Sequence, residues 1–229
     1  MLQKILVWFI GFSPFTKRWF WKKWYNVFAD RAKNSDFKFM NYGFDENGFF
    51  PDLKTEDKQE RYPIQLYHHV ASQTDLSGKV VLEVGSGRGG GASYVSRYLR
   101  PSSVLGVDIS ESAVELCNSI HAVDNLSFTV GDSEDLPFDA GSFDVVLNVE
   151  SSHCYGSVDQ FLKEVNRVLK PGGHFLWCDL RPPGNINDTY SRFEKAGFNI
   201  VQKRDITKNI LSALSKMTAS RKKAIQERV

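Results

Sequence analysis

The chain has 229 residues, of which 41% are hydrophobic and 24% are charged, and its formal net charge is +2. This length and composition exclude a chain that is disordered throughout, and they fit one domain with a sizeable core. Positive charge gathers in residues 1–33 and 203–229, so the middle of the chain is acidic. Basic ends are compatible with contact with an anionic surface, and equally with solvated helix faces.

Residues 1–28 are rich in aromatic side chains. Their apolar run, residues 5–12, is too short to span a bilayer, and an early Pro14 without a small-residue cleavage site argues against a signal peptide. Tryptophans interleaved with lysines and an arginine are typical of a membrane interface, but they also fit a helix packed over the domain or a substrate pocket. The sequence predicts a cytoplasmic protein and leaves peripheral membrane contact through residues 1–28 open.

The pattern changes at about residue 59, and we expect residues 1–58 to form an N-terminal aromatic and basic helix with a loop, and residues 59–229 to form the main domain. A helix is predicted over 60–72. Strands and helices then alternate, which predicts an α/β fold with a doubly wound, mostly parallel sheet. The expected strands are 80–84, 103–107, 126–130, 143–149, 173–178 and 198–201, and the expected helices are 91–99, 111–121, 158–169, 186–196 and about 208–226, with a looser crossover over 134–142.

A glycine-rich stretch, Gly85-Ser86-Gly87-Arg88-Gly89-Gly90, follows the first buried strand and precedes a helix. Such a turn lets backbone N–H groups face a ligand, and glycine admits backbone angles and close approach that a side chain would block. The spacing fits both a dinucleotide and S-adenosylmethionine (SAM). The second strand ends in Asp108, whose carboxylate suits the ribose diol of either cofactor.

Further motifs follow the later strands in a fixed order: GD-x-x-x-LPF at 131–138, FDVV at 143–146 and LKPGG at 169–173. Together with the glycine stretch, they resemble the class I SAM-dependent methyltransferases over residues 80–180. Residues 60–185 resemble more closely the phthiotriolone/phenolphthiotriolone dimycocerosates methyltransferase group, through IQLYHHVASQTDLSGKVVLEVGSGRGGGASYVSRYL, FDVVLNVESSHCYGSV and CDLRP. The resemblance implies SAM as cofactor, a Rossmann-like fold, and O-methylation of a hydroxyl group on a hydrophobic lipid- or polyketide-like small molecule.

The resemblance also assigns roles to particular residues. Glu83, Gly85 and Gly87 are expected to hold the methionine part of SAM, with the carboxyl group near its ammonium. The other expected contacts are Asp108 with the ribose, Ile109 beside the adenine, Asp132 and Ser133 at the adenine edge, and Asn148 beneath the sulfonium.

His153 follows the fourth strand and Asp179 ends the fifth, so in this topology the two side chains are expected to meet above the cofactor. An imidazole oriented by a carboxylate suits a general base for a hydroxyl; the alternative is a histidine that only lines the pocket and an aspartate that caps a loop. No clustered ligand set predicts a metal, and the three cysteines, Cys117, Cys154 and Cys178, fit reduced structural thiols.

The resembling enzymes continue to a final antiparallel strand beside the fifth, and no strand-like run follows residue 201 here. The last antiparallel strand is therefore expected to be missing, which leaves open a catalytically weak or inactive SAM-binding module as the alternative function. A nicotinamide oxidoreductase remains compatible with the glycine spacing alone. No N/D-P-P-Y/F acceptor motif follows the fourth strand, so nucleic acid is not an expected partner.

Overall fold

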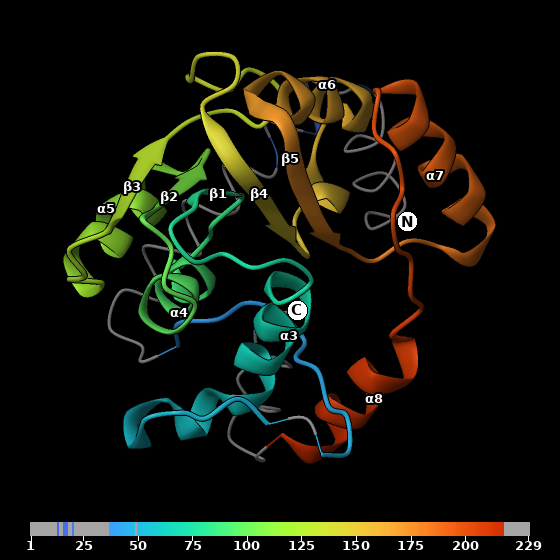
Figure 1. The fold of residues 1–229 in the computed structure, drawn as a ribbon. Helices are drawn as coiled ribbons and strands as arrows, with labels where there is room; N and C mark the ends of the chain where they lie inside the picture. Colours follow the sequence, from blue (N-terminus) through green and yellow to red (C-terminus); the bar gives the residue numbers. More distant parts are fainter. Residues whose placement is uncertain (1–12, 14–15, 18–19, 21–36, 49, 218–229) are drawn as a thin grey trace.

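The computed structural model describes residues 13, 16–17, 20, 37–48 and 50–217. They fold around a sheet of five parallel strands in the order β3-β2-β1-β4-β5 (Figure 1). The strands are β1 (Val80–Val84), β2 (Ser103–Asp108), β3 (Leu126–Val130), β4 (Phe143–Val149) and β5 (Leu169–Cys178). This arrangement confirms the predicted doubly wound α/β class, and no antiparallel strand joins the sheet within the described residues.

The helices alternate with the strands as predicted, most of them within a residue of the expected ends. Two of them begin at a serine whose side chain accepts a backbone N–H three residues on: Ser110 before α5 and Ser157 before α6. The helices are η1 (Thr55–Glu60), α3 (Arg61–Ala71), α4 (Gly90–Tyr98), α5 (Glu111–Ile120), η2 (Ser152–Cys154), α6 (Val158–Val168), η3 (Pro183–Asn185), α7 (Ile186–Lys195) and α8 (Thr207–Lys216).

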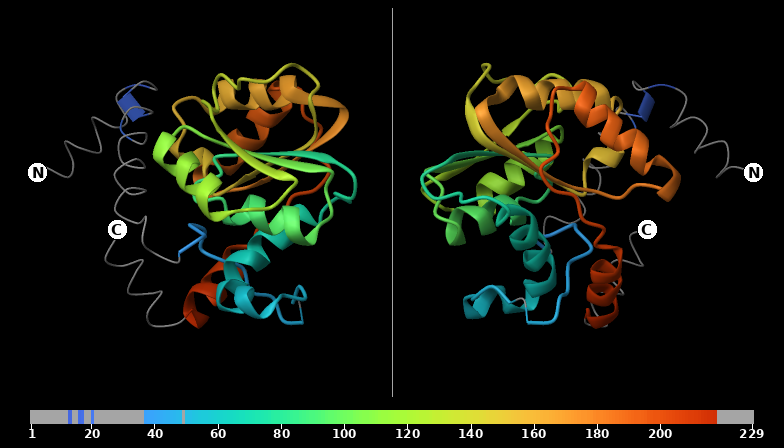
Figure 2. Two further views of the ribbon diagram at one scale, coloured as in Figure 1. Left: turned by 90° about the vertical axis from the view of Figure 1, so that its left-hand side faces the viewer. Right: turned by 45° about the vertical axis from the view of Figure 1, so that its right-hand side comes forward.

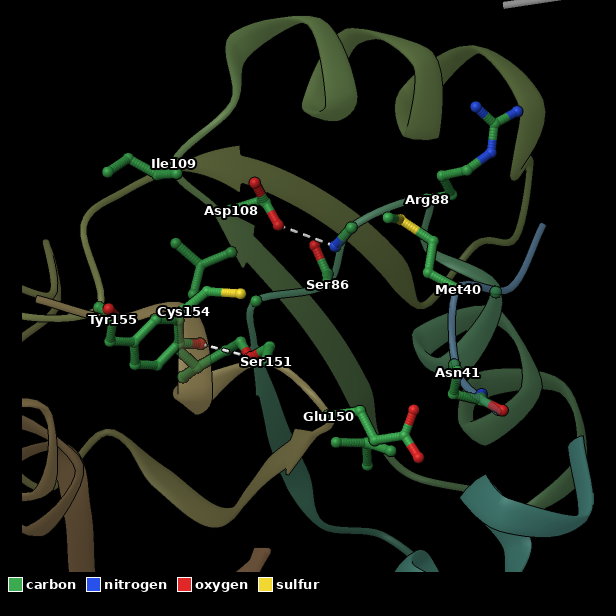
Figure 3. A pocket seen from close by; sticks show the side chains of 18 of the residues that line it. Met40, Asn41, Ser86, Arg88, Asp108, Ile109, Glu150, Ser151, Cys154 and Tyr155 are labelled. Carbon is green, nitrogen blue, oxygen red and sulfur yellow. Dashed lines mark hydrogen bonds between the residues drawn. The ribbon is translucent and has the colours of Figure 1, made fainter. Parts of the chain in front are cut away.

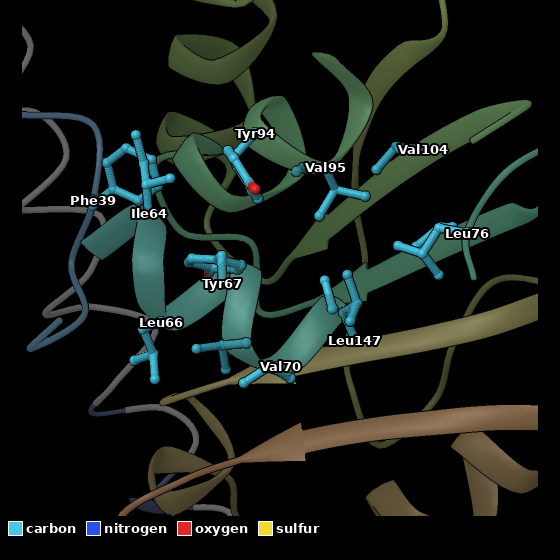
Figure 4. Close-up of a cluster of buried hydrophobic side chains, with 14 of the residues drawn as sticks. Phe39, Ile64, Leu66, Tyr67, Val70, Leu76, Tyr94, Val95, Val104 and Leu147 are labelled. Carbon is cyan, nitrogen blue, oxygen red and sulfur yellow. The ribbon is translucent and has the colours of Figure 1, made fainter. Parts of the chain in front are cut away.

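Helices cover both faces of the sheet because side chains of the strands alternate between two apolar clusters. On one face, Val81 of β1 and Leu147 of β4 pack with α3, α4 and α5 (Figure 4). On the other face, Leu82 and Val146 pack with α6 and α7. The two views in Figure 2 show the sheet between these layers.

The strand order reverses between β1 and β4, which lie side by side while the chain leaves them in opposite directions along the sheet. In an open α/β sheet, ligands bind beyond the carboxyl ends of the strands at this switch point. The glycine stretch follows β1, and Glu150–Cys154 follow β4 at the same edge. The fold therefore brings the sequence motifs singled out above to one place.

Two predictions about the last strands need correction. Residues 198–201 form no strand: Phe198 and Ile200 pack against the cluster beneath α6 and α7, whereas Val201 is 85% exposed and pairs with no neighbour. The strand β5 begins at Leu169 and not at residue 173, because Leu169 pairs with Phe143 before the Lys-Pro-Gly-Gly segment bulges out of register.

The N-terminal segment 1–28 lies outside the described residues except for Ser13, Thr16, Lys17 and Phe20, as does the end of the helix predicted over 208–226. Peripheral membrane contact and the division at residue 58 therefore stay predictions. Within the described part of the chain, no helix has the length and apolar character needed to cross a membrane.

Candidate active site

A cavity of about 900 Å³, including its open mouth, lies at the switch point (Figure 3). Its walls come from segments that are distant in sequence: residues 38–41, Tyr67 of α3, the glycine stretch after β1, the end of β2, the end of β3, and the segment after β4. Among the predicted site residues, the cavity is lined by Gly85, Gly87, Asp108, Ile109, Asp132 and Ser133.

The glycine stretch turns sharply beneath this cavity. Gly85 and Gly87 adopt positive φ angles of 75° and 53°, which favour glycine. A Cβ atom on Gly85 would lie 2.2 Å from Oγ of Ser151, so a side chain there would collide with the segment after β4. The glycine at position 85 therefore allows the segments that follow β1 and β4 to pack closely against each other.

Buried polar groups hold the turn from behind. The N–H of Gly87 donates to Oδ2 of Asp108 at 2.8 Å. Nε2 of His121 donates to the carbonyl oxygen of Arg88 at 2.8 Å. Burial raises the pKa of Asp108, and Oδ1 of the same carboxylate accepts the N–H of Ser110. The carboxylate at the end of β2 thus faces the cavity while it fixes the glycine turn.

Glu83 and Asn148 do not line the cavity, and both are fully buried behind it. Oε1 of Glu83 accepts the hydroxyl hydrogen of Tyr67 at 2.6 Å, and burial raises the pKa of Glu83 to about 8. Nδ2 of Asn148 lies within hydrogen-bond distance of the carbonyl oxygen of Val84 and of the hydroxyl groups of Ser151 and Tyr155, among which its two hydrogens are shared. Their predicted direct contacts with SAM stay predictions, since each side chain meets the cavity through a neighbour.

Residues 37–45, here called the strap, cross the mouth of the cavity. Phe39 and Phe44 of the strap are buried in the core cluster around α3, and Nε of Arg88 donates to the carbonyl oxygen of Phe37. The strap fits closely, because a Cβ atom on Gly90 would lie 2.4 Å from the carbonyl oxygen of Lys38. The sequence suggested only a loop here, and no local pattern marks it as a cavity wall.

His153 and Asp179 meet, as the topology predicted. Nδ1 of His153 lies 2.6 Å from Oδ1 of Asp179, whose side chain is fully buried. Because an ionised carboxylate only accepts hydrogen bonds, Nδ1 carries the hydrogen and Nε2 is left for other partners. The pair does not line the cavity itself, but the adjacent Cys154 does.

Other donors fix the same carboxylate. Nη1 of Arg181 lies 3.0 Å from Oδ2 of Asp179, and the backbone N–H of His153 donates to Oδ2 at 2.8 Å. Burial opposes ionisation, but His153 and Arg181 hold the pKa of Asp179 below its usual range. Burial also disfavours the charged imidazole, yet the hydrogen bond to Asp179 raises the pKa of His153 to about 10.

The residues around the cavity fit SAM. Oγ of Ser86 is buried, lines the cavity and has no hydrogen-bond partner among the described residues, so it is available to a ligand. The Asp108 carboxylate suits a ribose diol. Gly85 and Gly87 line the cavity without a side chain that would block the close approach of a ligand. When bound there, SAM would contact the glycine turn, Asp108 and the strap.

This fold, with its cavity beyond β1 and β4 and a carboxylate at the end of β2, defines a Rossmann-like α/β protein with a site suited to a nucleoside. Residues 82–177 match the methyltransferase domain family. The phthiotriol/phenolphthiotriol dimycocerosates methyltransferase of Mycobacterium leprae is 39% identical over 196 residues, which cover 85% of this chain and 73% of the relative. The fatty-acid O-methyltransferase of Mycolicibacterium smegmatis is 42% identical over 193 residues, covering 84% and 70%.

Among solved structures, Haemonchus contortus phosphoethanolamine N-methyltransferase 2 in complex with SAM has a TM-score of 0.60 at 20% identity. The match covers 71% of this chain and 43% of that chain. This similarity shows that the two proteins share a fold. The chain belongs to the family of SAM-dependent methyltransferases that contains the phthiotriol/phenolphthiotriol dimycocerosates methyltransferases. Its cofactor is SAM, as predicted. The comparisons support an enzyme and not the inactive module.

Sequence reasoning missed several cavity residues, among them Met40, Asn41, Tyr67 and Glu150. The strap residues and Tyr67 reach the cavity only through tertiary packing. Glu150 could have been predicted as a cavity residue, since it directly follows β4 at the edge of the sheet where ligands bind.

Proposed function

We propose that this enzyme transfers the methyl group of SAM to an oxygen atom of a hydrophobic, lipid-like acceptor, with a hydroxyl group as the leading candidate. The observation that carries the proposal is the imidazole of His153, held at 2.6 Å by the buried Asp179 next to the SAM cavity. The relatives named for phthiotriol dimycocerosates and for fatty acids support a hydrophobic acceptor.

Bound SAM supplies a methyl group on a positively charged sulfur, which leaves as a neutral thioether. For an alcohol acceptor, Nε2 of the uncharged His153 ring would accept the proton of the acceptor hydroxyl. Asp179 holds Nδ1 and stabilises the imidazolium that results. The strap and the segment after β4 hold the reactants together and exclude water.

A carboxylate acceptor is a second candidate, favoured by one observation. With a pKa raised to about 10, the ring of His153 is an imidazolium at neutral pH, and an imidazolium beside Arg181 would bind a fatty-acid carboxylate. Such an acceptor needs no base, because its oxygen is already ionised. The relative named for fatty-acid O-methylation supports this reading.

The two acceptors differ in their dependence on pH. We expect methyl transfer from isotope-labelled SAM to a long-chain alcohol to rise from pH 7 to 10, as His153 loses its proton. Transfer to a fatty acid of equal length should fall over the same range as the imidazolium is lost. For the alcohol, His153→Ala should slow transfer by about 10²- to 10⁴-fold.

His174→Ala serves as the matched control, since His174 lies on β5 and does not line the cavity. Transfer to the alcohol at an undiminished rate by His153→Ala would remove the proposed base. Transfer to neither acceptor, with SAM bound, would favour the inactive module over the proposed function.

A further inference from the structure

Glu150 is a carboxylate in the SAM cavity to which neither the sequence nor the proposed reaction gives a role. It directly follows β4 and lines the cavity. Figure 3 shows Glu150 and Asn41 together, well away from Ile109 at the other side of the cavity. Since Ile109 is the residue expected beside the adenine, Glu150 lies toward the methionine end of the cofactor.

The backbone at Glu150 is unusual. Its φ angle is 49°, a left-handed conformation that costs a non-glycine residue about 1 kcal/mol or more. Two contacts hold it there: the N–H of Glu150 donates to the carbonyl oxygen of Cys178 at 2.7 Å, and Oε2 accepts the N–H of Tyr42 in the strap at 2.9 Å. Such an outlier is maintained only where the surroundings over-determine it, which is common at ligand sites.

Within the described residues the carboxylate of Glu150 forms no ion pair, and the nearby His153 is the cationic group that favours its charge. Within the described residues, the bond from Tyr42 is its single recorded hydrogen bond, and it pairs with no lysine or arginine. Burial and the nearby Asp179 raise the pKa of Glu150 to about 7. By contrast, Glu134 in the same cavity accepts two backbone N–H groups, from Gly156 and Ser157. One oxygen of Glu150 is therefore available to a cationic ligand group.

Glu83, the residue that the family resemblance assigns to the ammonium of SAM, is fully buried behind Tyr67 and does not line the cavity. A buried carboxyl group that already accepts the tyrosine hydroxyl is badly placed to meet a charged ligand. Glu150, by contrast, lines the cavity itself.

We propose that the carboxylate of Glu150 binds the α-ammonium group of SAM. The proposal rests on its position at the methionine end of the cavity, on the oxygen that has no hydrogen-bond partner in the described part of the chain, and on its left-handed backbone. The same carboxylate holds the strap through Tyr42, so ligand and strap share one anchor. The contact is independent of the acceptor, and it can be tested without one.

The test is calorimetric binding of three ligands to the full chain: SAM, S-adenosylhomocysteine (SAH) and 5′-methylthioadenosine. SAM and SAH carry the ammonium, whereas methylthioadenosine lacks the amino-acid part. In Glu150→Gln the amide oxygen can still accept the N–H of Tyr42, so the charge is lost while the strap contact is kept. We expect affinity for SAM and SAH to fall on the order of ten- to hundred-fold, and affinity for methylthioadenosine to stay unchanged.

Glu134→Gln is the matched control, because it removes a charge from the same cavity; it should leave the ratio of SAH to methylthioadenosine affinity unaltered. Equal losses for all three ligands in Glu150→Gln would mean a loosened cavity, and a loss for SAM alone would mean a contact with the sulfonium. Either result overturns the proposal. A third result would also overturn it: a change in the ratio of SAH to methylthioadenosine affinity in Glu83→Gln with no such change in Glu150→Gln. If Glu150→Gln does not fold, the same three ligands are titrated into Glu150→Asn. Asparagine tolerates a left-handed backbone better than most residues.

Discussion

Asp179 shows how one buried carboxylate is kept ionised. Its side chain has no exposure, yet it faces the imidazole of His153 at 2.6 Å and the guanidinium of Arg181 at 3.0 Å. The indole N–H of Trp177 also donates to Oγ of Ser152, which in turn donates to Asp179. Removing one partner from such a network leaves a buried charge without compensation, so the network acts as a unit.

This network makes a prediction about His153. In Asp179→Asn the amide oxygen can still accept the hydrogen of Nδ1, but the negative charge is gone, so the pKa of His153 should move down from about 10 toward its ordinary value of 6.5. NMR titration of the His153 ring measures this directly. Methyl transfer to an alcohol should reach its plateau at lower pH and at a lower rate.

Asp188→Asn is the control for that titration, since Asp188 is an exposed residue of α7 paired with Arg192. It should leave the His153 titration where it is in the unaltered protein. A ring that titrates at the same high pH in Asp179→Asn would show that Asp179 does not set its charge.

The glycine turn is the element on which we expect cofactor binding to depend. Its conformation is fixed by φ angles that disfavour other residues, by the N–H of Gly85 donating to the carbonyl oxygen of Val107 at 2.8 Å, and by the contact with Ser151. Backbone strain and steric conflict can be separated here, because Gly141 also has a positive φ, of 68°, with no atom within 4 Å of an added Cβ.

We therefore expect Gly85→Ala and Gly141→Ala to share a stability loss of about 1 kcal/mol or more from backbone strain. Only Gly85→Ala should weaken SAM binding, because Ser151 and the turn must move apart. We expect a loss of affinity of about tenfold or more, similar to the loss of one hydrogen bond to a charged group. Thermal unfolding and SAM titration of both variants measure the two effects. Equal SAM affinity in both variants would contradict the role given to the turn.

At the scale of the whole molecule, local patterns located the five strands of the sheet, although they also predicted a sixth strand at 198–201 that does not form. The apolar runs at 80–84 and 143–149 became β1 and β4, and the glycines between β1 and α4 marked the switch point. The pair formed by His153 and Asp179 followed from the same topology, because adjacent parallel strands end at one edge.

What could not be predicted depends on contacts between distant residues. The strap reaches the cavity because Phe39 and Phe44 are buried against α3, and a loop sequence carries no sign of that packing. The apolar run 198–201 satisfies the strand pattern, but it has no partner strand among the described residues, and only Phe198 and Ile200 pack beneath α6 and α7. Glu83 and Asn148 are at the expected edge but face inward.

The strap also bears on the domain division that we propose at residue 58. Residues 38–41 on its N-terminal side line the cavity, and Tyr42 donates to Glu150 after β4, so a unit that binds SAM in this cavity would include them. The contact between Asp45 and Asn209 further joins the strap to α8. Cofactor binding is thus a property of most of the described chain.

The central claim is that the cavity between β1 and β4 holds SAM, and calorimetric titration with SAM tests it most directly. We expect one SAM bound per chain, competition by SAH, and a loss of affinity on the order of tenfold or more in Asp108→Ala, which removes the carboxylate that faces the cavity and that we expect to bind the ribose. Well-folded protein that gives no binding heat with SAM, or that binds a nicotinamide dinucleotide in its place, would contradict the account.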